Sequence, residues 1–244
     1  MSVSVAVIAL NEGKNIEACL ESVRWADEIV VVDSGSTDAT VEKARRFTGK
    51  IDRVPFRDFA SQKNEALARA TKEWVFFLDA DERVPEDLAA EIRRVVSGPA
   101  ERAYAVGRVT YFWGKRLRFS GTQEDFPVRL FPRTEACFEQ PVHERVVTGL
   151  PLTRLKSRLL HFTTRDWPHY RSKLDQYIPL EIETMKQKGR RPCVADLVLR
   201  PPAVFVSLYL LRLGLLDGLA GLKYAVLSSY YCFLKYRRFL ACCP

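Results

Sequence analysis

Short apolar runs alternate with amphipathic segments through the first hundred residues, and this pattern is the main structural signal in the chain. The apolar runs are rich in Val, Ile and Phe, as in strands buried on both faces, and lie at 2–10, 28–32, 50–54 and 74–78. Helical spacing of apolar residues predicts helices at 16–23, 38–47, 58–70 and 85–96. Thr37 is expected to cap the second helix. The alternation predicts an α/β fold with a parallel sheet and right-handed crossovers.

Polar residues follow the predicted strands directly, at the end where a parallel sheet binds ligands. Asn11 and Glu12 follow the first strand, Asp33 follows the second, and Asp79 and Asp81 follow the fourth. Two carboxylates one residue apart repel each other and lose hydration unless a cation compensates them. Mg²⁺ would do so, because it binds oxygen ligands and shares them with substrate phosphates. The alternative is that Asp79 caps a turn and that Asp81 and Glu82 are solvated. The position after a buried strand, within a repeated strand-helix pattern, favours the metal pair.

The pattern changes after residue 98. Strand-like runs at 103–113 and 126–132 flank a basic, turn-rich segment at 114–121, and 168–188 predicts an amphipathic helix. These changes predict a division of the chain into 1–165, itself made of 1–98 and 99–165, and a C-terminal helical region, 166–244.

Hydrophobicity rises again over 203–234, where Arg212, Asp217 and Lys223 interrupt it. Uncharged runs there reach about ten residues, whereas a membrane-spanning helix needs ~20. Basic residues alternating with Tyr, Phe and Leu are typical of helices that lie in the headgroup region of an anionic membrane. The alternative is a helical pair that packs on the domain with its Lys and Arg side chains solvated.

The net charge of +8 is distributed unevenly. Residues 1–100 carry 14 Lys and Arg against 18 Asp and Glu, a net of −4, and residues 101–244 carry 24 against 12, a net of +12. The basic part predicts an anionic partner, such as nucleic acid, phosphorylated sugars or acidic lipid headgroups. None of the six cysteines forms a Cys-x-x-Cys pair, and the N-terminus begins directly with a strand. We therefore expect a cytoplasmic protein without a signal peptide.

Several common motifs do not fit this sequence. No Gly-x-Gly-x-x-Gly follows the first strand, and 107–115 has the wrong spacing for a P-loop, which disfavours dinucleotide-dependent oxidoreduction and P-loop ATP hydrolysis. His143-Glu144 begins like a zinc-protease motif, but Val147 stands where the second histidine is needed. Taken alone, His161 and His143 fit hydrogen-bonded core residues.

Two other functions share part of the pattern. A nucleotidyltransferase would use the same sheet and metal, but it needs a glycine-rich, basic loop after the first strand, where this chain has Asn-Glu-Gly-Lys-Asn at 11–15. A nucleic-acid-binding module would explain the basic half. Against it, the basic residues alternate with aliphatic runs, and no recognition-helix or RNA-binding aromatic motif is present.

Motifs in order along nearly the whole chain resemble those of family 2 glycosyltransferases of the GT-A fold. They are Asn11-Glu12, Cys19-Leu20-Glu21-Ser22-Val23, the run from Trp25 to Asp38, and Asp79-Ala80-Asp81-Glu82-Arg83-Val84. Others resemble the lipopolysaccharide core subgroup, which includes enzymes that add β-linked glucose to inner-core heptose or Kdo: Trp25-Ala26-Asp27-Glu28, Val142-His143-Glu144, Leu160-His161-Phe162-Thr163 and Leu215-Leu216-Asp217-Gly218. The resemblance implies a Rossmann-like, mostly parallel sheet flanked by helices, with a C-terminal helical membrane-associating appendage.

The resemblance also implies roles for the two parts of 1–165. Residues 1–98 would bind the nucleotide sugar, with Asn11, Glu12 and Asp33 on the base and ribose and Lys63 near the sugar nucleotide. Residues 99–165 would bind the acceptor, with basic contacts from Arg116, Arg118, Arg129 and Arg133.

The metal ligands follow from the same resemblance. Asp79 and Asp81 would be the metal-binding pair for Mg²⁺ or Mn²⁺, with Asp81 the more direct ligand. Such enzymes often use a later histidine as a further ligand, for which His161 is preferred over His143.

The general base would be a carboxylate, with Glu144 the first choice and Asp125 the second. The Glu-Asp base motif and the downstream Gln-x-x-Arg-Trp of processive relatives are missing from this sequence, so the base assignment rests on the subgroup pattern. The implied reaction is inverting transfer of a sugar, glucose from UDP-glucose or else heptose from ADP-heptose, to a lipopolysaccharide inner-core glycolipid. The implied location is the cytoplasmic face of the inner membrane, without a nucleic-acid partner.

Overall fold

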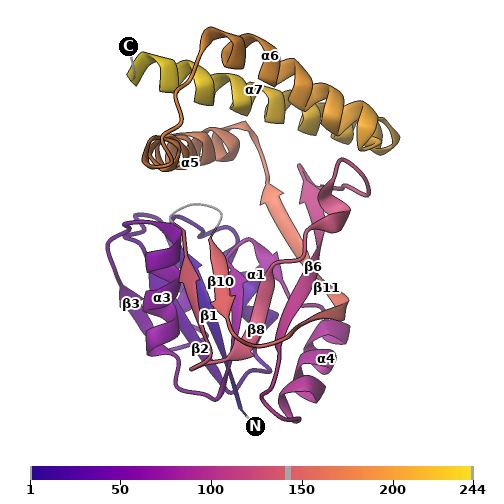
Figure 1. The fold of residues 1–244 in the computed structure, drawn as a ribbon. Helices are drawn as coiled ribbons and strands as arrows, with labels where there is room; N and C mark the ends of the chain where they lie inside the picture. Colours follow the sequence, from indigo (N-terminus) through magenta and orange to yellow (C-terminus); the bar gives the residue numbers. More distant parts are fainter. Residues whose placement is uncertain (1, 141–143, 243–244) are drawn as a thin grey trace. The chain divides into compact units, whose positions relative to one another are not determined.

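The computed structural model describes residues 2–140 and 144–242 (Figure 1). The chain forms two compact units that are each discontinuous in sequence. The first unit is Met1–Arg108 with Phe126–His161, and the second unit is Val109–Asp125 with Phe162–Pro244. The helical region that the sequence places at 166–244 belongs to the second unit, which also takes in the short segment 109–125.

Four parallel strands form one half of the main sheet, in the spatial order β3-β2-β1-β4. Their bounds are β1 Val3–Ala9, β2 Glu28–Asp33, β3 Ile51–Arg53 and β4 Trp74–Asp79. The helices of this part are α1 Ile16–Glu21, α2 Thr40–Ala44, α3 Phe59–Arg69 and α4 Glu86–Val96. The predicted alternation of strands and helices is therefore confirmed.

The other half of the sheet is antiparallel, so the sheet as a whole is mixed. It continues from β4 in the order β8-β6-β11-β5, with β7 paired to the end of β6. Their bounds are β5 Glu82–Arg83, β6 Ala103–Phe112, β7 Lys115–Arg116, β8 Val128–Pro132 and β11 Leu152–Thr164. A separate ribbon consists of β9 Ala136–Glu139 and β10 Arg145–Thr148.

Strand β4 is buried on both faces, as its continuous apolar run predicts. Trp74, Phe76 and Leu78 enter one apolar cluster, and Val75 and Phe77 enter the other. Each of these side chains is at most 1% exposed. A strand with both faces covered by side chains is fixed in register, because a shift by one residue would exchange the two cores. The residues at its carboxyl end are therefore held in place.

Local capping explains where two of the helices begin. The carboxylate of Asp58 accepts the N–H of Ser61 at 2.8 Å and caps α3. The predicted Thr37 cap is wrong, because α2 begins only at Thr40 and the carboxylate of Asp38 accepts the N–H of Thr40 at 3.0 Å. The backbone N–H of Thr37 donates instead to Asn11 Oδ1, 2.9 Å away.

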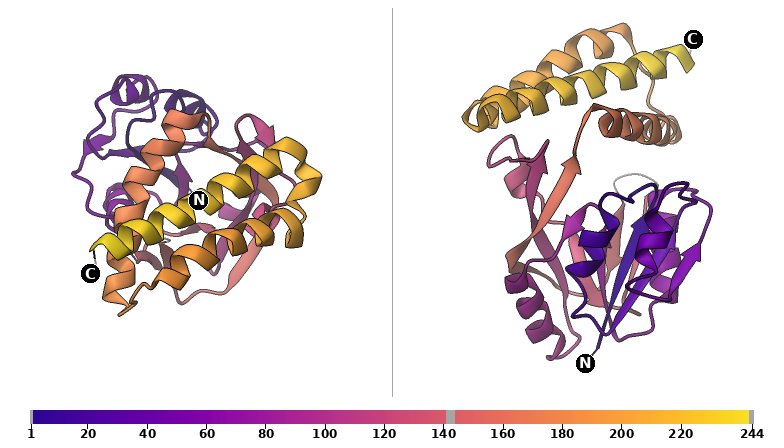
Figure 2. Two further views of the ribbon diagram at one scale, coloured as in Figure 1. Left: turned by 90° about the horizontal axis from the view of Figure 1, so that it is seen from above. Right: turned by 180° about the vertical axis from the view of Figure 1, so that it is seen from behind.

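The second unit is built mainly from helices. They are η1 Thr122–Glu124, α5 Trp167–Gln187, α6 Val194–Val206, the π-helical turn η2 Ser207–Leu211, the one-turn η3 Gly214–Asp217 and α7 Gly218–Cys242. Helices α6 and α7 lie side by side (Figure 2), and Ser229 Oγ donates to the carbonyl of Pro201 at 2.8 Å.

One helical segment in the described chain, Val194–Leu211, is long and apolar enough to cross a membrane, and 6% of it is buried. This differs from the expectation from sequence, which counted only uncharged runs. The segment contains the charged residues Asp196 and Arg200.

Candidate active site

The parallel register brings the predicted polar residues to one edge of the first unit. Ala9 of β1 pairs with Asp33 of β2, and Ile8 pairs with Asp79 of β4. Asn11, Asp33 and Asp79 therefore lie at the carboxyl ends of three neighbouring strands, as the sequence predicts. In open α/β sheets this edge is where ligands bind.

Asp33 joins the loops of this edge through hydrogen bonds to one of its two carboxylate oxygens. Its Oδ2 accepts the N–H groups of Gly35 and Ser36, each at 2.9 Å, and the side chain is fully buried. Among the described residues, Oδ1 has no hydrogen-bond partner. A buried acceptor without a partner is costly, so this oxygen is a position where a ligand donor would be stabilising.

Asn11 and Glu12 form the loop that faces Asp33 along the edge. Asn11 adopts a left-handed conformation with φ 54°, and its backbone N–H donates to Ser36 Oγ at 2.8 Å. Glu12 accepts a 2.7 Å hydrogen bond from Asn15. Gly13 follows, and a Cβ there would lie 2.8 Å from Asp38 Oδ2, so the close approach of the two loops requires glycine.

Three protein cations occupy both oxygens of Asp79. Lys63 Nζ lies 3.2 Å from Oδ1, while Arg129 Nη2 and Arg108 Nη2 lie 2.5 and 3.2 Å from Oδ2. Burial opposes ionisation, but the charges of Arg129, Lys63 and Arg108 hold the pKa of Asp79 well below its usual value. Three cationic side chains therefore neutralise the Asp79 carboxylate, and its pairing with Asp81 on a metal stays a prediction.

Glu82 supports the same arrangement and was not predicted as a site residue. It is fully buried; its Oε1 lies 2.8 Å from Arg129 Nη2 and from Arg108 Nε, and its Oε2 accepts the N–H of Asp79 at 2.9 Å. Arg129, expected to contact the acceptor, is 2% exposed and binds these carboxylates instead. The available signal was an arginine inside each of the apolar strands β6 and β8. We call Lys63, Asp79, Glu82, Arg108 and Arg129 the Asp79 cluster.

Asp81 and His161 form a separate pair. His161 Nε2 lies 3.6 Å from Asp81 Oδ2, and the pairing of β11 with β5 places His161 opposite Glu82. Oxygen and imidazole donors suit Mn²⁺, and the carboxylate suits Mg²⁺. No group of three or more His, Cys, Asp and Glu converges as a metal site within 2–140 and 144–242. The pair therefore fits an ion that takes its other ligands from substrate phosphates. His143 lies outside the described residues.

Glu144 is linked to the carboxyl end of β4 by Lys63, which contacts both Glu144 and Asp79. Its Oε1 lies 2.5 Å from Lys63 Nζ, which also contacts Asp79, and the Lys63 side chain is 4% exposed. The Glu144 side chain is 21% exposed, so its carboxylate is both fixed and accessible. Sequence reasoning named both residues but not their contact, since they are far apart in the chain. The second predicted base, Asp125, follows η1 in the second unit.

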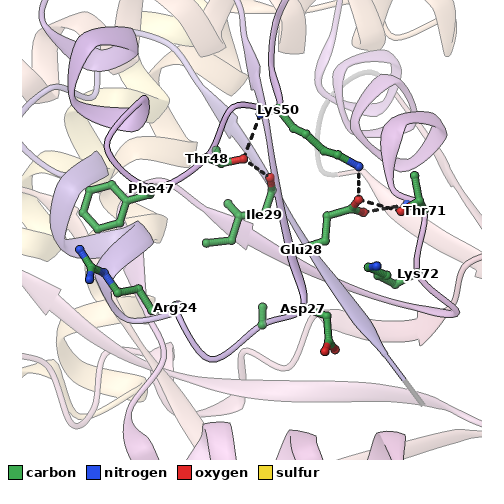
Figure 3. A pocket seen from close by; sticks show the side chains of 10 residues that line it. Arg24, Asp27, Glu28, Ile29, Phe47, Thr48, Lys50, Thr71 and Lys72 are labelled. Atoms are coloured by element: carbon green, nitrogen blue, oxygen red, sulfur yellow. Dashed lines mark hydrogen bonds and ion pairs between the residues drawn. The ribbon is translucent and has the colours of Figure 1, made fainter.

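The motif Trp25–Glu28 lies at the opposite, amino end of the strands, where a hollow of about 430 Å³ opens (Figure 3). Glu28, at the start of β2, is bonded to Lys50, to Thr71 and to Ser4 Oγ at 2.5 Å. Burial would raise its pKa, but these donors lower it to about 2. Glu28 therefore stabilises the fold at the end of the strands opposite to the candidate site.

Comparison with known proteins shows the family of the chain. Residues 4–157 match the model of the glycosyl transferase family 2 domain. The chain belongs to this family. The predicted GT-A fold and glycosyltransferase activity are thereby confirmed, and the nucleotidyltransferase and nucleic-acid-binding alternatives are set aside.

Individual relatives in the family are similar over different lengths. The lipopolysaccharide core biosynthesis glycosyltransferase LpsC of Rhizobium meliloti (strain 1021) is 30% identical, over 96% of this chain and 90% of LpsC. An uncharacterized glycosyltransferase of Rickettsia bellii (strain RML369-C) is 34% identical over 42% of this chain and 35% of its own. Among solved structures, glucosyl-3-phosphoglycerate synthase from Mycobacterium tuberculosis, in complex with Mg²⁺ and UDP, has a TM-score of 0.38 and 26% identity, over 44% of this chain and 43% of that one.

Proposed function

We propose that this family 2 glycosyltransferase is an inverting, metal-dependent enzyme that transfers glucose from UDP-glucose to a lipopolysaccharide inner-core glycolipid. The observation that carries the proposal is the accessible Glu144 carboxylate, fixed by buried Lys63 on the unit that also holds Asp81 and His161. The acceptor class is supported by the similarity to LpsC over nearly the whole chain.

The donor half of the site uses the ends of the parallel strands. The free oxygen of Asp33 accepts a hydrogen bond from the nucleoside, with Asn11 and Glu12 beside it. Asp81 and His161 would hold Mg²⁺ or Mn²⁺, which when bound neutralises the charge that grows on the departing diphosphate. The Asp79 cluster fixes the backbone of this turn, because Glu82 accepts the N–H of Asp79.

Glu144 performs the proton transfer. It takes the proton of the acceptor hydroxyl while that oxygen attacks the anomeric carbon from the face opposite the diphosphate. The new glycosidic bond forms as the bond between the sugar and the diphosphate breaks, which inverts the anomeric centre. Lys63 orients the carboxylate through its 2.5 Å contact. General-base assistance of this kind contributes roughly 100- to 10,000-fold to the rate.

The acceptor half of the proposal concerns charge and location. Arg116, Arg118 and Arg133 would contact the phosphate and carboxylate groups of the glycolipid. Sequence 101–244 carries a net charge of +12, which favours the anionic cytoplasmic face of the inner membrane. ADP-heptose is the alternative donor.

A nucleotide-release assay tests the proposal. The purified protein is incubated with Mn²⁺ or Mg²⁺ and a panel of nucleotide sugars, with and without lipid A–Kdo–heptose acceptors. UDP-glucose with acceptor and metal is expected to release nucleotide, and EDTA is expected to abolish the release. Release from ADP-heptose alone would overturn the donor assignment, and release unchanged by EDTA would overturn metal dependence.

Single substitutions test the roles of Glu144 and Asp81 and decide whether Glu144 or Asp125 is the general base. Glu144→Gln and Asp81→Ala are each expected to lower transfer roughly 100- to 10,000-fold, with Glu139→Gln, an exposed carboxylate on β9, as the matched control. Near-normal transfer by Glu144→Gln, together with loss in Asp125→Asn, would assign the base to Asp125.

A further inference from the structure

The turn between α6 and α7 exposes an unusual number of leucines. We call residues 210–219 the elbow; it holds six leucines at 42–76% exposure, namely Leu210, Leu211, Leu213, Leu215, Leu216 and Leu219. Soluble proteins rarely leave such a concentrated apolar patch in water, and patches of this kind mark membrane or protein contacts.

The elbow is a built structure with close internal contacts. Leu213 adopts a left-handed conformation with φ 57°, which is unfavourable for leucine. The turn closes tightly, because a Cβ on Gly221 would lie 1.9 Å from the carbonyl oxygen of Gly214. The fold therefore holds the leucines outward in a defined arrangement, at a conformational cost.

Asp217 joins this elbow to a basic loop of the same unit. Its carboxylate accepts the N–H groups of Arg118 and Phe119 at 2.8 and 3.0 Å and the hydroxyl of Ser120 at 3.3 Å. The N–H of Ser120 also donates to the carbonyl of Arg212 at 2.9 Å. The one acidic residue of the elbow is thus turned toward the protein, and it holds the segment 115–120 against the apolar turn.

The exposed charges beside the elbow are mostly basic, with Glu124 of η1 as an exposed acidic residue. Lys115, Arg116 and Arg118 are exposed on the held loop, and the Lys223 amine lies 4.8 Å from the ring centroid of Trp113. Over 190–244 the sequence has eight Lys and Arg against two acidic residues, Asp196 and Asp217. Apolar side chains surrounded by cations and an aromatic ring match the interface of an anionic bilayer.

We propose that the elbow inserts into the headgroup and upper acyl region of an anionic lipid bilayer, and that Asp217 clamps the basic loop 115–120 at the same lipid surface. This proposal extends the proposed function. It depends on that function only in taking the sugar acceptor to be a glycolipid. The proposal assigns the membrane contact to the elbow and not to a membrane-spanning helix formed by α6. Arg200 of α6 is hydrogen-bonded to Asp196 at 2.5 Å, and its guanidinium lies 5.2 Å from the ring centroid of Tyr236.

Vesicle flotation tests the insertion without any sugar present. The full chain is mixed with phosphatidylcholine vesicles with or without 30% phosphatidylglycerol, and it is expected to bind the anionic vesicles at least tenfold more tightly. The double variant Leu211→Ser, Leu216→Ser is expected to lower partitioning about 100-fold, as burial of two leucines implies. The control is Val147→Ser with Leu152→Ser, which changes exposed aliphatic residues of the first unit. Equal flotation of the elbow variant and the wild type would overturn the proposal, as would retention of the protein in membranes after alkaline carbonate extraction.

Two substitutions of equal charge test the clamp. Asp217→Ala releases the loop, whereas Asp217→Asn keeps a side-chain oxygen that can accept its N–H groups. We expect the Ala variant to bind anionic vesicles at least fivefold more weakly than the Asn variant, and equal binding would refute the clamp. Circular dichroism checks that both variants fold. Failure of the proposed function would appear separately, as absent nucleotide release with normal flotation.

Discussion

The partly exposed carboxylate of Asp79 and the buried carboxylate of Glu82 share two arginines at the end of β4. Burying such groups is costly, and each is tolerated only while its partners remain. Burial would lower the pKa of Arg129, but Asp79 and Glu82 raise it above its ordinary value, so the guanidinium stays charged. The ion pairs of Asp79 and Glu82 with the two arginines hold the turn that carries Asp81 in place.

Removing one partner should therefore be expensive. We expect Arg129→Met to lower the free energy of unfolding by about 3–5 kcal/mol, because it removes the more deeply buried of the two arginines that Asp79 and Glu82 share. Urea unfolding measures the change. The control is Arg93→Met, which removes an exposed ion pair with Glu86 and should cost less than about 1 kcal/mol. Equal costs for both variants would show that the cluster is not desolvated.

Glu28 gives a pH-dependent prediction. Its pKa falls from an ordinary 4.5 to about 2 in the folded protein, so its contribution is fully present above pH 4.5 and is lost as the pH falls toward 2. That contribution is on the order of 3 kcal/mol. We expect Glu28→Gln to be less stable than wild type at pH 6, with the difference shrinking steadily between pH 5 and pH 3 in urea unfolding. A difference that is constant over this range would contradict the assignment.

The sequence alone predicts the position of some site residues but not of others. Asn11, Asp33 and Asp79 could be predicted, because each follows an apolar strand and parallel strands align their ends. Glu82 and Arg108 could not, because their meeting depends on antiparallel pairing among β5, β6, β8 and β11. Nothing in the local pattern specifies which of those strands are neighbours.

The same contrast appears among the elements. Helices α3 and α4 came from the periodicity of their own residues and match the prediction to within one residue at each end. The 13-residue strand β11 was not predicted. The two-residue strand β5 and the ribbon of β9 and β10 were not predicted, because such short segments become strands only through their partners. The start of α2 was also missed. Thr37 is a good capping residue by type, but its backbone N–H donates to Asn11, and the helix begins only at Thr40, after Ala39.

The cap of α3 is important because this helix carries Lys63. Asp58→Ala should lower the free energy of unfolding by about 1 kcal/mol, since the N–H of Ser61 loses its acceptor. Asp58→Asn keeps an acceptor and should stay within a few tenths of a kcal/mol of wild type. Thermal unfolding of the three proteins gives the comparison, and a loss equal in both variants would point to charge and not to the cap.

For the whole molecule, ligand binding should be visible as stability. If Asp81 and His161 hold the metal, UDP with Mn²⁺ at 100 times the dissociation constant should stabilise the protein by about 2.7 kcal/mol. Differential scanning fluorimetry should show a rise in melting temperature that EDTA removes. Asp81→Ala should lose the Mn²⁺-dependent part of this rise, whereas Glu139→Gln should retain it. A rise that survives in Asp81→Ala would place the metal elsewhere.

The second unit consists of two separate stretches of the chain, Val109–Asp125 and Phe162–Pro244. Both stretches must therefore come from the same parent when segments are exchanged between related proteins. Phe112 contacts the ring of Tyr224, and Asp217 bonds the backbone at Arg118 and Phe119. A recombination event that exchanged only the tail after residue 165 would leave these partners mismatched. We therefore expect a hybrid of this protein and a family relative to fold only when segment 109–125 and the chain after residue 165 come from the same parent.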